Sequence, residues 1–336
     1  MKLKEFNYSL PQELIAQKPV RPRDHSRLMV LNRKNHTIIH DSFYNLDKYL
    51  RPNDVLIANN SKVIPARLFG KKTTGGKMEI LLLRPLKGDQ WEIVLKGKGE
   101  QNKEIKFSKK LFGILKQQIS NQTWKIEFNL TNNDLLKQIY KLGHPPTPPY
   151  IKRVSNLQEY QTIYAQAPGS AAAPTAGFHF TKKLIKKLKK QGNKFEFVTL
   201  HVGLGTFQPV RTENIEEHQI HAEWGEITQQ TAEKLNQVKE NKQRIIAIGT
   251  TTIRILEAFT LENVLIPGEK WINTFIYPGY EFKFINGLIT NFHLPKSSLL
   301  MLVCAFTEKD FILQAYKQAI KEKYRFYSFG DAMLII

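Results

Sequence analysis

Cysteine is nearly absent from this sequence: Cys304 is the only one among 336 residues. A single cysteine excludes an internal disulfide and a zinc site built on cysteines. Because Cys304 stands in the apolar run "LLMLVCAF", we predict that it packs in the hydrophobic core.

Long apolar segments are missing as well. The first residues, "MKLKEFNYSLPQELI", contain no apolar stretch typical of a signal peptide. No apolar run elsewhere is long enough to span a bilayer. A hydrophobic content of 41% is nevertheless ordinary for a globular protein and argues against wholesale disorder. We therefore expect a cytoplasmic protein with no membrane partner.

Several familiar catalytic motifs are absent. The sequence has neither a GxSxG nucleophile elbow nor a Walker A loop, so hydrolase and P-loop functions lack support. It also lacks HExxH. In "EEHQIHAEW", His218 and His221 are three residues apart, a spacing that can share a helix face. Without a supporting cysteine we interpret them as a surface pair, and we expect no metal cofactor.

Acidic residues are outnumbered by basic ones. There are 30 Asp and Glu against 50 Lys and Arg, which gives a net charge of +20 and a pI near 9.8. This balance favours a polyanionic partner, because Lys and Arg near phosphates release counterions. The alternative is a lysine-rich surface that only aids solubility, as in "TKKLIKKLKKQG".

The chain is long enough for two domains. From Arg67 onward, short segments rich in Ile, Val, Phe and Trp are separated by Gly, Asn and Lys, a pattern typical of a small barrel or sandwich. A helix at "NNDLLKQIYKLG" and a stiff proline segment at "HPPTPPYIKR" follow. We predict an inserted β-barrel-like domain at 66–149 and a discontinuous α/β main domain at 1–65 and 150–336.

The remainder of the chain alternates between strands and helices. "FEFVTLHVG", "RIIAIG" and "AMLII" have the composition of strands, and "TTTIRILEAF" and "KSSLLMLVCAF" have that of helices. Such alternation predicts the fold class: a layered α/β/α domain with a mostly parallel sheet, carrying the inserted small all-β domain.

Ligands of such sheets bind beyond the carboxyl ends of the strands. In "HVGLGTFQPV", Gly203 and Gly205 would let the backbone approach a ligand. The loop is not a dinucleotide fingerprint, because Gln208 stands where the third glycine is needed and no helix follows at once.

A second loop, "IGTTTIR", is a strand-to-helix turn. Thr250 and Thr251 lie at the start of the helix, and Arg254 lies in its first turn. Free N–H groups and the helix dipole both favour an anion there. Ordinary threonine capping is the alternative, and it leaves Arg254 unexplained.

The segment "PGSAAAPTAGFHFT", residues 168–181, is almost free of large side chains before its two aromatic residues. It is either a linker or the smooth wall of a pocket, and the residues alone do not decide between the two. In the second case Gly177 would allow close approach of a ligand.

Three histidines, His179, His201 and His293, fall on loops expected on the ligand side of the sheet. Their common location favours a general base among them, although a lone histidine is usually structural. "YRFYSFGDAM", near the end of the chain, adds Asp331.

Seven motifs together resemble one known family. They are "NNSKVIPARLFG", "GHPPTPPYI", "PGSAAAPTAGFHF", "TLHVGLGTFQPV", "IGTTTIR", "TNFHLPKSSLLMLV" and "KYRFYSFGDAM". In this order they resemble the S-adenosylmethionine:tRNA ribosyltransferase-isomerases of queuosine biosynthesis. The resemblance covers nearly the whole chain.

The resemblance implies a specific reaction. The ribosyl part of S-adenosylmethionine would be transferred to 7-aminomethyl-7-deazaguanine at the tRNA wobble position, giving epoxyqueuosine and releasing adenine and methionine. S-adenosylmethionine would be consumed as cosubstrate, with no metal. A tRNA partner agrees with the basic charge, and we expect a monomer. The target base lies in an anticodon loop, where it can be splayed out and stacked on aromatic side chains.

With the resemblance in view, we assign hypothetical roles to the loop residues. The adenosyl or methionine part would contact the small-residue wall and the glycine loop, through Ala173, Thr175, Gly177, Gly203, Gly205 and Thr206. A carboxylate or an RNA phosphate would be held by Thr250, Thr251 and Arg254. The acid/base candidates are His179, His201, His293 and Asp331. The tRNA backbone would meet Arg23, Arg27, Arg67, Lys152 and Arg153.

Two other functions stay open at this point. A non-catalytic tRNA-binding protein would use the basic surface and keep the glycine loops as scaffolding. An enzyme acting on a small anionic metabolite would use the helix start near Arg254 and would not depend on tRNA. The ordered set of loops argues against the first, and the charge argues mildly against the second.

Overall fold

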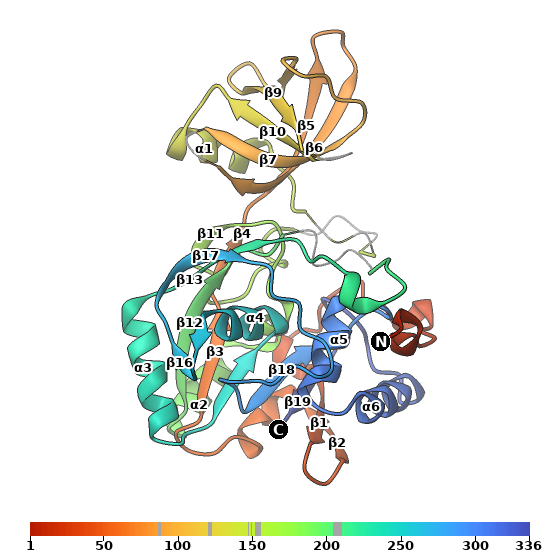
Figure 1. Ribbon diagram of the computed structural model, residues 1–336, viewed down its shortest axis with the longest axis vertical. Coiled ribbons are helices and arrows are strands. Elements are labelled where there is room, and N and C mark those ends of the chain that lie inside the picture. The colour runs from red at the N-terminus through yellow and green to blue at the C-terminus, as the bar shows by residue number, and fades with distance from the viewer. Residues whose placement is uncertain (87–88, 120–122, 147, 149, 152–155, 204–209) are drawn as a thin grey trace.

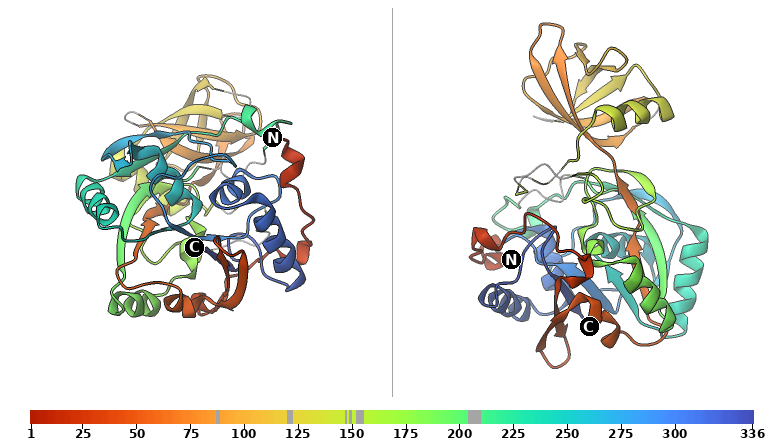
Figure 2. Two further views of the ribbon diagram at one scale, coloured as in Figure 1. Left: turned by 60° about the horizontal axis from the view of Figure 1, so that its bottom comes forward. Right: turned by 180° about the vertical axis from the view of Figure 1, so that it is seen from behind.

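The computed structural model describes residues 1–86, 89–119, 123–146, 148, 150–151, 156–203 and 210–336. It has a large α/β main domain and a smaller barrel that stands apart from it, joined by extended segments (Figure 1). The barrel lies above the edge of the main sheet where β3 and β12 end, as the view from behind also shows (Figure 2). The predicted fold class, an α/β main domain with a small all-β domain, is confirmed.

The main domain is built on a nine-stranded sheet in the order β17-β13-β12-β3-β14-β18-β19-β1-β2. Its strands are β1 (Arg27–Asn32), β2 (Thr37–Ser42), β3 (Val55–Asn59), β12 (Lys194–Leu200), β13 (Glu223–Ile227), β14 (Ile245–Ile248), β17 (Gly268–Ile272), β18 (Gly287–Asn291) and β19 (Ala332–Ile335).

The sheet is mixed, so the expectation of a mostly parallel sheet was wrong. The pairs β12–β3, β3–β14, β14–β18 and β19–β1 are parallel. The pairs β17–β13, β13–β12, β18–β19 and β1–β2 are antiparallel. The hairpin β1–β2 needs no helical crossover, but helices lie between β18 and β19 and between β13 and β17 along the chain. The alternation of strands and helices in the sequence therefore does not fix the strand directions.

Both faces of the sheet are covered, because alternate residues of the central strands point to opposite sides. Val55 and Ile57 of β3 face a core shared with α3, α4, α5 and α6. Leu56 and Ala58 face a second core, shared with α2. The helices are α2 (Lys182–Lys190), α3 (Gln229–Glu240), α4 (Thr250–Phe259), α5 (Ser298–Phe306) and α6 (Lys309–Lys321).

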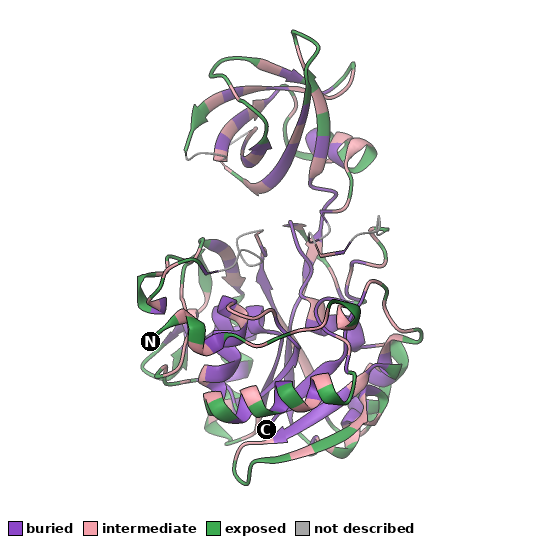
Figure 3. Ribbon diagram, turned by 90° about the vertical axis from the view of Figure 1, so that its right-hand side faces the viewer, coloured by how far each residue is buried: buried purple, intermediate pink, exposed green. Residues whose placement is uncertain are grey.

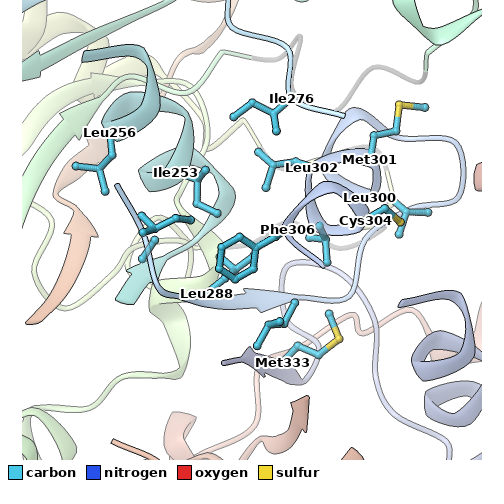
Figure 4. Packing of buried hydrophobic residues seen from close by; sticks show 14 of the residues in the cluster. Ile253, Leu256, Ile276, Leu288, Leu300, Met301, Leu302, Cys304, Phe306 and Met333 are labelled. Atoms are coloured by element: carbon cyan, nitrogen blue, oxygen red, sulfur yellow. The ribbon is translucent and has the colours of Figure 1, made fainter. Parts of the chain in front are cut away.

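The strands in the middle of the sheet are buried along their length, as expected for strands covered on both faces (Figure 3). Between α4, α5 and the strands β18 and β19, apolar side chains interlock around Phe306 (Figure 4). Cys304 lies in this cluster with 0% exposure, which confirms its predicted place in the core.

The smaller domain is a closed antiparallel barrel with the strand order β10-β7-β6-β5-β8-β9. Buried residues alternate with half-buried ones along β7 and β10, and both Trp91 and Trp124 are buried in the barrel core. The strands are β5 (Arg67–Lys72), β6 (Lys77–Pro85), β7 (Gln90–Lys96), β8 (Glu104–Lys106), β9 (Phe112–Gln118) and β10 (Thr123–Phe128), followed by helix α1 (Asn132–Leu142). These elements fall inside the predicted insertion; its limits at residues 66 and 149 stay a prediction.

Shorter elements complete the chain. Two-stranded sheets join β4 to β11 and β15 to β16. Their bounds are β4 (Ser61–Val63), β11 (Ala167–Ser170), β15 (Thr260–Leu261) and β16 (Val264–Leu265). The short 3-10 helices are η1 (Leu3–Phe6), η2 (Gln12–Leu14), η3 (Arg23–His25), η4 (Phe43–Lys48), η5 (Thr175–His179) and η7 (Ile215–Glu217). Within the described residues, no helix combines the length and the apolar character that crossing a membrane requires.

Candidate active site

A cavity of about 420 Å³ opens beyond the carboxyl ends of β14 and β18. This strand-end cavity is where the sheet topology predicts a ligand. It brings together five of the residues proposed from the sequence: Ala173, Thr175, Thr250, Thr251 and His293. The segment 168–181 therefore contributes a wall of this cavity, in agreement with the pocket interpretation rather than the linker.

The floor of the strand-end cavity is the start of α4. Gly249 precedes the helix with φ +91°, a conformation that favours glycine, and its N–H is donated to the Ile289 carbonyl at 2.8 Å. Thr251 is 7% exposed, and its Oγ1 is buried without a hydrogen-bond partner among the described residues. A buried hydroxyl without a partner costs free energy unless a ligand supplies one. The chemistry of this hydroxyl and of the helix start is therefore suited to an anionic group.

His293, two residues after β18, also lines this cavity. Its Nε2 lies 2.8 Å from Thr290 Oγ1, and its backbone N–H is donated to Tyr316 Oη at 2.9 Å. Tyr8 Oη donates to the His293 carbonyl from the N-terminal segment. Burial lowers the pKa of His293 to about 3, which keeps the imidazole neutral at physiological pH. When Nε2–H is donated to Thr290, Nδ1 is left as a proton acceptor.

Two other acid/base candidates are buried in structural networks outside the lining. His179 is held between Ser26 Oγ at 2.7 Å from Nδ1 and Asn291 Nδ2 at 3.0 Å from Nε2. Burial lowers its pKa to about 3, and the positive charges of Arg23 and Arg325 act in the same direction. The carboxylate of Asp331 accepts the backbone N–H groups of Arg27 and Arg325 at 2.9 and 2.8 Å, while burial raises its pKa.

His201 lies in a different cavity. This interdomain cavity of about 750 Å³ lies between the barrel and the main domain, and Gly203 also lines it. Gly177 lines neither of the two cavities; it packs so closely that an added Cβ would lie 2.0 Å from Tyr164 Oη. Gly205 and Thr206 are outside the described residues.

Arg254 is not available to a ligand in the way that the motif suggests. Its guanidinium forms an ion pair with Glu223, and each side chain is 3% exposed. Its Nε–H and Nη2–H groups donate hydrogen bonds to the carbonyls of Thr274 and Ile272, at 3.2 and 3.3 Å. Glu223 also accepts the N–H of Gly203 at 2.8 Å, so the pair fixes the glycine loop to α4 and β17.

The arginines proposed to meet tRNA are engaged with the protein itself. Arg23 donates to the carbonyls of Gln161 and Glu159 at 2.7 and 2.6 Å. Arg27 donates to the Glu322 carbonyl at 2.6 Å, and Arg67 lies 3.5 Å from Glu79. Lys152 and Arg153 are outside the described residues. The tRNA role of all five stays a prediction.

Asn291 is a site residue that the sequence reasoning missed. Its Oδ1 accepts the hydroxyl of Thr175 at 3.1 Å, and its Nδ2 donates to His179 and to the Tyr327 carbonyl. It therefore fixes three segments of the cavity wall. Its position at the carboxyl end of a buried strand, beside His293, was the available signal. No group of three His, Cys, Asp or Glu suited to a metal occurs in the described ranges, which include His218 and His221.

A mixed sheet covered by helices on both faces, with a cavity at its strand ends, a helix N-terminus and a neutral histidine, defines an α/β enzyme of the class that binds small organic ligands. The chain belongs to the queuosine biosynthesis protein family, whose model matches residues 3–335.

Named relatives agree with this membership. The S-adenosylmethionine:tRNA ribosyltransferase-isomerase of Carboxydothermus hydrogenoformans is 50% identical over 345 residues, with both chains fully covered. The protein of the same name from Thermotoga petrophila is 48% identical over 341 residues, again with full coverage. A crystal structure of S-adenosylmethionine tRNA ribosyltransferase from Thermotoga maritima is 39% identical, covers 99% of this chain and 100% of its own, and has a TM-score of 0.56.

Proposed function

We propose that this protein transfers and isomerises the ribosyl moiety of S-adenosylmethionine onto 7-aminomethyl-7-deazaguanine at the tRNA wobble position. Epoxyqueuosine forms, and adenine and methionine leave. The observation that carries the proposal is full-length similarity to enzymes of that name, combined with a strand-end cavity that offers an anion site and a neutral histidine.

S-adenosylmethionine binds in the strand-end cavity. Its methionine carboxylate lies at the start of α4, where the unpartnered Thr251 hydroxyl and the first N–H groups of the helix satisfy it. The buried Ala173 and Ala176 leave room for the ligand at the wall. Arg254 does not take part directly, because its charge is already paired with Glu223.

His293 is the general base. The sulfonium acidifies the adjacent ribose carbon, and the His293 imidazole takes the proton from it. Because burial lowers the pKa of His293, the proton does not stay on the ring but passes on to the departing adenine. Adenine leaves from C1′ and takes up a proton, and the C1′–O4′ bond of the ribose ring opens. The aminomethyl nitrogen of the target base, which loses one proton, and C5′ both bond to C1′, which closes the carbocycle. O4′ then displaces methionine from C5′ and forms the epoxide. Of the three histidine candidates, His293 is the one that lines the strand-end cavity. The sulfonium supplies the activation, so the reaction as written uses S-adenosylmethionine as its only cosubstrate and no metal.

The macromolecular partner is tRNA. A net charge of +20 supports binding to a polyanion. We place the reaction in the cytoplasm with its tRNA, and we propose a monomer, because residues of one chain form both cavities.

Adenine release tests this function. The purified protein is mixed with S-adenosylmethionine and with tRNA carrying 7-aminomethyl-7-deazaguanine, and adenine is measured by chromatography. Controls contain guanine-bearing tRNA or no tRNA. We expect adenine and an epoxycyclopentyl-bearing nucleoside with the modified tRNA alone. Tight tRNA binding without adenine would instead favour a non-catalytic tRNA-binding protein, and adenine release without tRNA would favour a small-molecule enzyme.

A further inference from the structure

The interdomain cavity has a wall from each domain. The barrel contributes Arg84 of β6 and Glu92 of β7, and the main domain contributes His201, Trp224 and Trp271. Strands β13 and β17, which carry the two tryptophans, lie on the side of the main domain nearest the barrel (Figure 1). The cavity, about 750 Å³, is within the usual size range of small-molecule sites.

Planar groups follow one another along this wall. The His201 ring stacks on Trp224 with 5.1 Å between centroids and 16° between planes. Trp224 is directly opposite Trp271 in the β13–β17 pairing, so their side chains share one face of the ribbon. The Arg84 guanidinium then lies 4.1 Å from the centre of the Trp271 ring. Trp271 remains 42% exposed, so part of its ring is available to another flat group.

The charges of the lining are paired. Arg84 forms an ion pair with Glu92, its neighbour across the strands, and Glu223 is engaged by Arg254 and Gly203. Burial lowers the pKa of His201 to about 4, so its ring is neutral. Its Nδ1 is buried without a hydrogen-bond partner among the described residues. A flat group with hydrogen-bonding edges suits this lining better than an anionic phosphate does.

A single layer of backbone separates the two cavities. His201 and Gly203 line the interdomain cavity, whereas Val202 between them lines the strand-end cavity. This alternation is the one expected for extended backbone. The bridge between Ala172 and Val202 holds the segment in place. A group bound in one cavity is therefore close to a ligand bound in the other.

We propose that the interdomain cavity receives the target base of tRNA after it has left the anticodon stack, with the base lying against Trp271 and Arg84. The proposal rests on the function proposed above, since it assigns the nucleic-acid subsite of that reaction. Single-stranded RNA is commonly recognised by stacking unstacked bases on aromatic side chains and arginine planes. The Glu92 carboxylate, which is ion-paired with Arg84, can also accept an N–H of such a base, because a carboxylate has two acceptor oxygens.

Binding of short RNA loops tests the proposal without catalysis. Two anticodon stem-loops are compared, one with 7-aminomethyl-7-deazaguanine at the wobble position and one with an abasic site there. We expect the wild-type protein to bind the base-bearing loop about 10-fold more tightly, within the range for a base stacked on an aromatic ring. Trp271→Ala and Arg84→Gln should reduce this ratio to near one.

Matched variants separate the base contact from general effects. Phe69→Ala removes an exposed aromatic residue of the same barrel, and Lys96→Gln removes one exposed positive charge; neither residue lines the interdomain cavity. Both controls should keep the 10-fold ratio. An unchanged ratio in Trp271→Ala and Arg84→Gln overturns the proposal, whatever happens to the absolute affinity. A base-dependent ratio in a wild-type protein that releases no adenine would refute the proposed reaction but not the subsite.

Discussion

Replacing Arg254 by Met is expected to destabilise the main domain rather than to remove a contact with substrate. The guanidinium is paired with Glu223, and both side chains are 3% exposed. It also holds two backbone carbonyls, those of Ile272 and Thr274. Met fills a similar length but leaves the Glu223 carboxylate charged, buried and without its partner cation.

The magnitude follows from the burial of the pair. Removing one partner of a buried ion pair costs about 3–5 kcal/mol, because the remaining charge is uncompensated. In a domain of roughly 250 residues each kcal/mol corresponds to about 2 °C or more, so the midpoint should fall by at least about 6–10 °C. The double variant Arg254→Met/Glu223→Gln should lose less than the sum of the single variants, because no unpaired charge remains.

Urea and thermal unfolding followed by circular dichroism at 222 nm measure this loss. Helices α2 to α6 lie in the main domain, so the signal reports chiefly on that domain. Lys234→Met is the matched control: its amine lies 3.2 Å from Glu196 at the surface, and its loss should cost less than about 1 kcal/mol. If Arg254→Met unfolds like the wild type but releases no adenine, the structural role is refuted and Arg254 is a substrate contact.

Two further predictions concern the cavity and the buried histidines. Thr251→Val should raise the KM for S-adenosylmethionine by about 10-fold or more, since a hydrogen bond to a charged group is worth about 1.5–3 kcal/mol. Thr251→Ser retains the hydroxyl and should keep the wild-type KM. A normal KM for the Val variant would contradict the proposed carboxylate site. In the folded protein His179 has a pKa of about 3, against an ordinary value of 6.5. Its contribution to the free energy of unfolding is therefore complete above pH 6.5. As the pH falls from 6.5 toward 3, the free energy of unfolding decreases by about 1.4 kcal/mol per pH unit. In His179→Asn, the slope of the unfolding free energy against pH, between pH 6 and pH 4, should be smaller by about 1.4 kcal/mol per pH unit, the value for one proton. An unchanged slope would show that His179 is protonated in the folded state.

Local motifs in the sequence were enough to select several of the residues that line the strand-end cavity. Thr250, Thr251 and His293 each follow a buried strand, and the rule that ligands bind at strand ends brought them to one cavity. The inserted β-domain was visible from a change in composition near Arg67. These features depend on residues close together in the chain.

Features that depend on distant partners were not predictable in the same way. From the sequence, Arg254 was predicted to bind an anion. Glu223, which neutralises it, is 31 residues away in the chain and belongs to strand β13, whereas Arg254 lies in helix α4. His201 was grouped with His293, but the alternation at Val202 turns it into the other cavity. Strands β13 and β19 run against the parallel centre of the sheet and carry no local signal of their direction, because register and neighbour are set by tertiary pairing.

The most direct test of the central claim is the single-turnover rate of adenine release by His293→Asn, with modified tRNA and saturating S-adenosylmethionine. Loss of a general base should lower this rate by about 10²–10⁴-fold. Equilibrium dialysis should show S-adenosylmethionine binding within about threefold of the wild type, because the carboxylate site at Thr251 is intact. A rate within threefold of the wild type would contradict the assignment of His293 as the base.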